Sequence, residues 1–136
     1  MTGVVVDASI ALAWCFPDEG SDDADRALAA IKGQTVLVPA VWALEIANAL
    51  LVGERRKRLK HPEVLRFLAL LEHLPISQDH QTASDSVTNV LPLAREHGLS
   101  AYDAAYLELA IRYNCPLATL DSGLRKAAER AGIKGL

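Results

Sequence analysis

The stretch TGVVVDAS, residues Thr2–Ser9, joins a run of valines to a single acid, Asp7. A continuous β-branched run without polar alternation is typical of a strand buried on both faces. The sequence SIALAWCF follows at once and predicts a short helix that stops near Pro17. A buried strand that leads directly into a helix is how a parallel sheet covered by helices begins.

The rest of the chain repeats this order of strand and helix. Buried strands are predicted in TVLVP (35–39) and CPLATL (115–120), with shorter ones in PIS (75–77) and IKGL (133–136). Turn residues in PDEGSDD (17–23) predict a loop. Helical patterns occupy 23–33, 40–58, 61–74, 80–98, 98–113 and 121–132, and Pro92 is expected to kink or split the fourth of them. We therefore predict an α/β fold whose parallel sheet has helices on both faces.

The composition is that of an ordinary globular protein. The 136 residues suit one domain over 1–136, with 51% hydrophobic and 23% charged residues. No apolar run approaches the roughly 20 residues of a membrane-spanning helix, and MTGVVVDASI does not resemble a signal peptide. Cys15 and Cys115 lie in apolar contexts without metal-type spacing, so reduced thiols and a cytoplasmic location are expected.

Charge is unevenly distributed along an acidic chain. Seventeen Asp and Glu face fourteen Lys and Arg, for a formal net charge of −3, which does not suit nucleic-acid binding through overall charge. Five of the cations are nevertheless concentrated in GERRKRLKH, residues 53–61. This cluster is either a solvated helix end or a local patch that contacts phosphates.

Three acids stand where strands end or helices begin. Asp7 and Asp121 each follow a predicted strand and precede a predicted helix, and Asp103 lies in the first turn of a helix, three residues after Ser100. Each of the three is also explained as a helix cap or a first-turn acid. Taken singly, they do not separate a capping role from chemistry.

Glu45 has no such explanation, because it lies inside PAVWALEIANALL, away from a helix end. A carboxylate among apolar neighbours is costly unless it is paired or coordinated. In open α/β sheets, ligands bind beyond the carboxyl ends of the strands, and Asp7, Asp121 and Glu45 are all within reach of that edge. Several carboxylates at one place repel one another by roughly 3 kcal/mol per pair at about 5 Å, and so require a cation.

The chemistry of such a site follows from its ligands. Carboxylate oxygens select Mg²⁺ or Mn²⁺ rather than zinc, and these ions commonly act on phosphate oxygens. No histidine is placed as a general base, because all four fall at polar helix ends. The sequence therefore favours phosphodiester chemistry.

Four segments in this order resemble the PIN-domain ribonucleases, and in particular the VapC-type toxins of type II toxin–antitoxin pairs. They are VVVDASIAL (4–12), PAVWALEIANAL (39–50), LSAYDAAYLELA (99–110) and LATLDSGLRKAA (117–128). The resemblance implies a three-layer α/β/α sandwich with a central parallel sheet of about five strands. It implies an endoribonuclease that depends on Mg²⁺ or Mn²⁺, a homodimer, and inhibition by a cognate antitoxin.

The resemblance also assigns roles to residues. The family's acidic positions match Asp7, Glu45, Asp103 and Asp121, which are expected to be catalytic and to ligate the metal. Small polar residues that support such a site match Ser9, Asn48 and Thr119.

Other classes of protein fit the residues less well. A haloacid-dehalogenase-type phosphatase needs a second aspartate two residues after the first, where this chain has Ser9. A receiver-type phosphoacceptor needs an aspartate at the end of its middle strand and a lysine beyond its last, and PIS and IKGL fit poorly. The remaining alternative is an interaction module that keeps the PIN fold without cleaving RNA.

Overall fold

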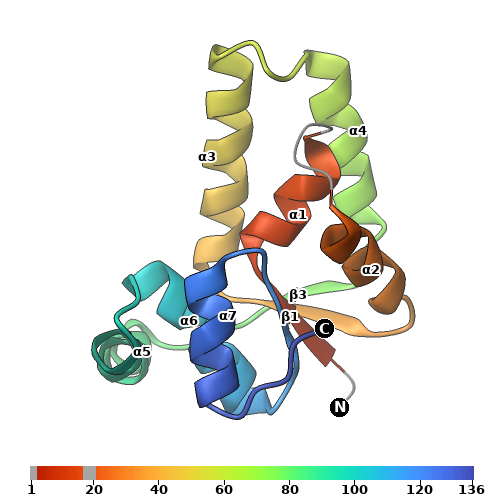
Figure 1. Cartoon of the computed structure of the whole chain (residues 1–136). Coiled ribbons are helices and arrows are strands. Elements are labelled where there is room, and N and C mark those ends of the chain that lie inside the picture. The colour runs from red at the N-terminus through yellow and green to blue at the C-terminus, as the bar shows by residue number, and fades with distance from the viewer. Residues whose placement is uncertain (1–2, 17–20) are drawn as a thin grey trace.

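The computed structural model describes residues 3–16 and 21–136, which form alternating strands and helices (Figure 1). The strands are β1 (Gly3–Val6), β2 (Thr35–Val38), β3 (Ile76–Gln78) and β4 (Leu117–Ala118). The helices are α1 (Ala8–Cys15), α2 (Asp22–Ala30), α3 (Val41–Arg55), α4 (His61–Glu72), α5 (Ala83–His97), α6 (Ala101–Tyr113) and α7 (Ser122–Arg130). Over the same residues, no helix has both the length and the apolar character needed to cross a bilayer.

The four strands form one parallel sheet in the order β3-β2-β1-β4. The chain moves from β1 outward through β2 to β3, then returns to place β4 on the other side of β1. β1 and β4 therefore flank the topological switch point, where the carboxyl ends of parallel strands leave a crevice. The predicted last strand is reduced to a single parallel bridge between Leu117 and Gly135.

Helices cover both faces of this sheet, which confirms the predicted α/β/α layering. α6 packs across β1, β2 and β4, and both α5 and α7 pack against α6. α1 to α4 occupy the other side, as right-handed crossovers require when the chain reverses direction across the sheet. In Figure 1, α3 and α4 form a hairpin that rises away from the sheet, and α1 lies between them and contacts both.

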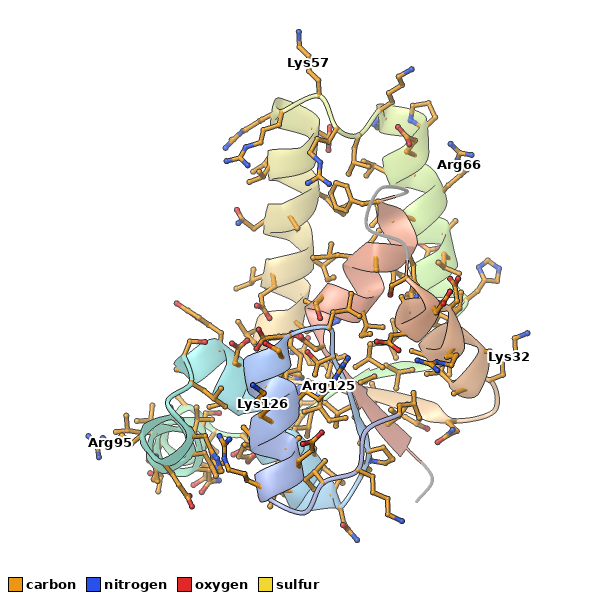
Figure 2. All side chains as sticks on the ribbon, in the orientation of Figure 1. Lys32, Lys57, Arg66, Arg95, Arg125 and Lys126 are labelled. Carbon is orange, nitrogen blue, oxygen red and sulfur yellow. The ribbon has the colours of Figure 1, made fainter. Side chains whose placement is uncertain are left out.

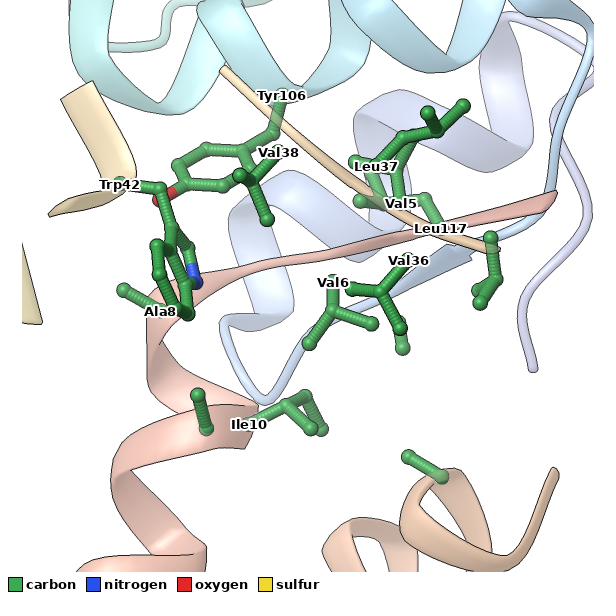
Figure 3. Close-up of a cluster of buried hydrophobic side chains, with 14 of the residues drawn as sticks. Val5, Val6, Ala8, Ile10, Val36, Leu37, Val38, Trp42, Tyr106 and Leu117 are labelled. Carbon is green, nitrogen blue, oxygen red and sulfur yellow. The ribbon is translucent and has the colours of Figure 1, made fainter. Parts of the chain in front are cut away.

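The core explains why the first strand is a continuous valine run. Val4, Val5 and Val6 are at most 1% exposed, because each face of β1 meets a helical layer. Val5 pairs in register with Leu37, and both belong to the same buried cluster as Tyr106 of α6, part of which is drawn in Figure 3. β1 is thus fixed at the centre of the molecule, and Asp7, the residue that follows it, lies at the switch point.

The helix boundaries follow local chemistry, with two differences from the predictions. Ser21, Thr82 and Ser100 cap α2, α5 and α6 by accepting hydrogen bonds from backbone N–H groups. Pro92 does not split α5, which runs as one helix from Ala83 to His97. The predicted loop 17–23 is shorter than expected at its end, because α2 already begins at Asp22; residues 17–20 of this loop lie outside the described part of the chain.

Candidate active site

Asp7 occupies the N-cap position of α1, but its side chain does not cap that helix. Its carboxylate is buried, and Oδ2 accepts hydrogen bonds from Ser9 Oγ at 2.8 Å and Thr119 Oγ1 at 2.7 Å. Because both hydroxyls donate to the same oxygen, Oδ1 keeps lone pairs that can ligate a cation. Capping therefore does not explain the position of this acid.

Ser9 and Thr119 also join the ends of the two strands beside the switch point. Ser9 Oγ accepts a hydrogen bond from the backbone N–H of Leu120 at 3.0 Å, and Thr119 Oγ1 accepts one from Asp121 at 3.0 Å. Each hydroxyl thus donates to Asp7 and accepts from the segment after β4. Together they hold the Asp7 carboxylate in one orientation and place Asp121 beside it.

Glu45 reaches the same region from the second turn of α3. Its Oε1 accepts a hydrogen bond of 2.5 Å from the hydroxyl of Tyr106, a fully buried residue of α6. This bond crosses from the helical layer on one side of the sheet to the layer on the other. The half-buried carboxylate is therefore partnered by a neutral phenol, which leaves its negative charge in place.

Asp103 and Asp121 both take part in helix starts. Ser100 Oγ accepts a hydrogen bond from the backbone N–H of Asp103, which fixes the first turn of α6, as the SAYD sequence suggested. Asp121 Oδ2 accepts one from the backbone N–H of Leu124 at 2.9 Å and caps α7. The capping interpretation is thus correct for the Asp121 side chain, while the cap of α6 is Ser100.

The structure brings the four acids together around one cavity of about 410 Å³. Its lining also includes Ser9 and Asn48, so six of the seven residues singled out in the sequence meet here, and the seventh, Thr119, touches Asp7. Within residues 3–16 and 21–136, no three acidic, histidine or cysteine side chains form a preformed ligand cage. The four carboxylates share the cavity without converging on one point, as their mutual repulsion requires.

The electrostatics of the cavity show the same repulsion. Burial raises the pKa of Asp7, and the negative charge of Asp121 adds to the effect. Burial likewise raises the pKa values of Glu45 and Asp103, and the Asp7 charge contributes in both cases. Clustered carboxylates with raised pKa values are typical of functional sites, because a bound cation relieves what packing alone would not tolerate.

The donor set fits a hard divalent cation. All four candidate ligands supply carboxylate oxygens, which Mg²⁺ and Mn²⁺ prefer, and no histidine or cysteine lines the cavity among the described residues. The open side leaves room for water and a phosphate group beside such an ion. Asp7 is the best-oriented ligand, because its two hydroxyl donors fix its second oxygen.

Sequence reasoning did not identify Tyr106 as a residue of the site, although its hydroxyl donates to Glu45. Tyr106 lies three residues after Asp103, so the two side chains share one face of the helix. This spacing was the signal in the sequence that Tyr106 could lie near the acids. His97 also differs from the expectation for the histidines, because its side chain is only 7% exposed.

A second polar cluster lies around Arg112 of α6. Its guanidinium pairs with Asp79 and with Glu108, and Gln81 donates a further hydrogen bond to Glu108. This network holds the segment after β3 against α6. The Arg112 guanidinium is thus engaged in ion pairs and helps to fix the position of α6.

Comparison with known proteins agrees with this architecture. Residues 4–130 match the family model of the PIN domain. The chain is 35% identical over 128 residues to ribonuclease VapC3 of Pyrobaculum aerophilum, covering 93% of each chain.

Solved structures share the fold. PAE2754 from Pyrobaculum aerophilum superposes with a TM-score of 0.68 at 24% identity, over 93% of this chain and 79% of that one. VapC20 of Mycobacterium tuberculosis, a sarcin-ricin loop cleaving toxin, gives 0.67 at 18% identity over 98% of each chain. FitAcB from Neisseria gonorrhoeae gives 0.62 at 15% identity, over 98% of this chain and 96% of that one. With its family model matched over most of its length, the chain belongs to the PIN-domain family.

Proposed function

We propose that this protein is a metal-dependent endoribonuclease and acts as the toxin of a toxin–antitoxin pair. The observation that carries the proposal is the single cavity at the sheet's switch point that Asp7, Glu45, Asp103 and Asp121 line together. Burial and mutual repulsion raise the pKa values of Asp7, Glu45 and Asp103, and a bound divalent cation would stabilise their ionised forms. RNA as the substrate is supported by the 35% identity to a protein named ribonuclease VapC3.

The proposed roles follow from the contacts of each side chain. A bound Mg²⁺ or Mn²⁺ supplies an activated water and offsets the charge that develops on the phosphodiester. Asp7 and Asp103 would hold this ion directly, and Glu45 would hold it or a water bound to it. Asp121 adds negative charge at the rim while capping α7, and Ser9 and Thr119 keep Asp7 in its ligating orientation.

The remaining parts of the proposal concern how the protein is organised and regulated. We propose that residues 1–136 form a single domain, that the protein is a homodimer in the cytoplasm, and that a cognate antitoxin inhibits it. VapC20, a structural neighbour described as a toxin, supports the toxin role through its shared fold.

Cleavage of total RNA by the purified protein, freed of any co-purifying partner, tests this function. We expect fragments to appear with Mg²⁺ or Mn²⁺ at low salt, and chelation by EDTA to stop the reaction. Asp7→Asn keeps the shape of the side chain and is expected to abolish cleavage, because it removes the best-oriented ligand. RNA that stays intact under all metal conditions would favour the alternative, a PIN-fold interaction module without nuclease activity.

A further inference from the structure

The basic cluster of the sequence forms the tip of the α3–α4 hairpin. Arg55, Arg56, Lys57 and Lys60 are exposed there, and no ion pair with any of them is recorded among the described residues. Figure 2 shows Lys57 at the far end of the hairpin, projecting into solvent. Arg58 is engaged differently, because its guanidinium lies 4.5 Å from the centroid of the Phe16 ring.

The cations at the tip continue a face of α3 that begins at the acid cavity. At about 100° per residue, Asn48 and Val52 lie on the same side of the helix as Glu45, and Arg55 and Arg56 complete that side. Glu45 and Asn48 line the cavity itself. A rise of 1.5 Å per residue places Arg55 about 15 Å beyond Glu45 along the helix axis.

Two other arginines, Arg125 and Arg112, are already engaged. Arg125 donates a hydrogen bond to the carbonyl oxygen of Thr119 at 2.7 Å and approaches Asp23 at 3.4 Å, and Arg112 pairs with Asp79 and Glu108. The chain has a net charge of −3. At the hairpin tip, by contrast, several exposed cations lie next to one another, and the described residues form no ion pairs with Arg55, Arg56 and Lys57.

We propose that the α3–α4 hairpin tip is a binding site for the RNA backbone, separate from the acid cavity. The inference rests on the proposed function and extends it. The strand runs along α3, with the scissile phosphate at the carboxylates and more distant phosphates at Arg55, Arg56 and Lys57.

The chemistry of the tip favours a polyanion over a protein partner. Residues 54–58 are all charged and exposed, with no apolar side chain among them. Cores of protein interfaces are enriched in aromatic residues, methionine and arginine and depleted of lysine and glutamate. A turn that has arginines but no aromatic or apolar side chain lacks the buried centre of such an interface. Guanidinium and ammonium groups spread over an exposed turn match a flexible phosphate chain, whose affinity comes from counterion release.

The test compares a hairpin variant with a variant matched in charge. The hairpin variant carries Arg55→Gln, Arg56→Gln and Lys57→Gln. The control carries Lys32→Gln, Arg95→Gln and Lys134→Gln, three exposed cations away from the hairpin, of which Lys32 and Arg95 are labelled in Figure 2. Both variants lose three positive charges, so any effect of net charge alone is the same. Thermal unfolding verifies that both remain folded.

Steady-state cleavage is measured on a trinucleotide and on a 20-nucleotide RNA. We expect the hairpin variant to raise KM for the long RNA about tenfold with kcat unchanged, and to change cleavage of the trinucleotide less than about twofold, because a short substrate does not reach the tip. The slope of log KM against log salt should fall by about 2 for three lost contacts with single-stranded phosphates. The control should match the wild type on both substrates.

Three results would overturn the proposal: no change in KM for the long RNA, equal losses on both substrates, or equal losses in the control. Anisotropy with the 20-nucleotide RNA and with a polyglutamate peptide, each in the absence of turnover, separates the two macromolecules. Loss of peptide binding with RNA binding intact would assign the tip to an acidic protein. If the wild type cleaves neither RNA, the nuclease function fails, and the anisotropy measurement still decides the RNA site.

Discussion

Glu45 and Tyr106 show how a carboxylate is kept charged in a half-buried position. The phenol donates to Oε1 at 2.5 Å, and its own pKa is raised by burial and by the neighbouring Glu45 charge, so the proton stays on Tyr106. The hydrogen bond stabilises the negative form of Glu45 and opposes the rise in its pKa that burial causes. Tyr106 is therefore a positioning residue for a proposed metal ligand.

Tyr106→Phe tests this role. Removing the hydroxyl leaves a half-buried carboxylate without its donor, so the free energy of unfolding should fall by about 1–2 kcal/mol. Loss of this orienting partner should weaken Mn²⁺ binding about tenfold by calorimetry. Tyr102→Phe is the control, because Tyr102 is 63% exposed, and both quantities should stay at their wild-type values. An unchanged Mn²⁺ affinity in Tyr106→Phe would remove Tyr106 from the site.

At the scale of elements, the position of α3 depends on Gly53. A Cβ at this position would come within 2.9 Å of Phe16 Cζ and 3.0 Å of Leu59 Cδ1. Glycine thus allows the end of α3 to pack closely on the residue that follows α1. This close approach supports the hairpin whose lower part carries Glu45.

Gly53→Ala sets two effects against each other. Alanine favours the helix by about 1 kcal/mol, while overpacking against Phe16 costs about 1–3 kcal/mol. We expect a net loss of about 1 kcal/mol in urea unfolding. Gly123→Ala in α7 is the matched control, since its Cβ would lie 3.5 Å from Asp121 Oδ2, an ordinary contact, and it should stabilise by up to about 1 kcal/mol. If Gly53→Ala instead raised the free energy of unfolding, α3 and Phe16 would be able to move apart without loss of stability, and the close packing at Gly53 would not be required.

The sequence predicted the elements well where pattern and burial agree. The valines of β1 indicated a strand buried on both faces, and the register with β2 confirms it. Asp7 and Asp121 were predicted at the carboxyl edge because strand ends in a parallel sheet share that edge.

Long-range partners could not be predicted in the same way. The Tyr106–Glu45 bond joins residues 61 apart, and the Arg112–Asp79 pair joins residues 33 apart. Periodicity describes only near neighbours along the chain, so it predicts neither of these two pairs. The partial fifth strand, a single bridge at Leu117 and Gly135, likewise depends on tertiary contacts.

For the whole molecule, the acid cavity predicts an unusual dependence of stability on pH. Asp7, Glu45 and Asp103 have pKa values in the folded protein that lie above the ordinary values of 3.8 for aspartate and 4.5 for glutamate. At a pH between the ordinary and the raised value of a group, the native state therefore binds more protons than the unfolded state. The contribution of these three groups to the free energy of unfolding is fully present below about pH 4, and it is lost as the pH rises through their raised pKa values. Urea unfolding of the metal-free protein should therefore show a free energy that declines from pH 4 toward pH 7.

Saturating Mn²⁺ should reverse this trend, because a cation binds the ionised carboxylates of the native state and stabilises it more as they lose their protons. The comparison uses the same protein with EDTA and with Mn²⁺ at each pH. Parallel pH profiles in the two conditions would mean that the ion binds elsewhere or does not bind.

The central claim is that the carboxylates of one cavity hold the ion that cleaves RNA, and Asp103→Asn tests it most directly. The substitution keeps the backbone N–H that Ser100 caps and removes a charge that repels Asp7 and Asp121. We expect cleavage of RNA in Mn²⁺ to fall at least about a hundredfold, while the metal-free protein becomes more stable than the wild type. Cleavage by Asp103→Asn at the wild-type rate would contradict the account.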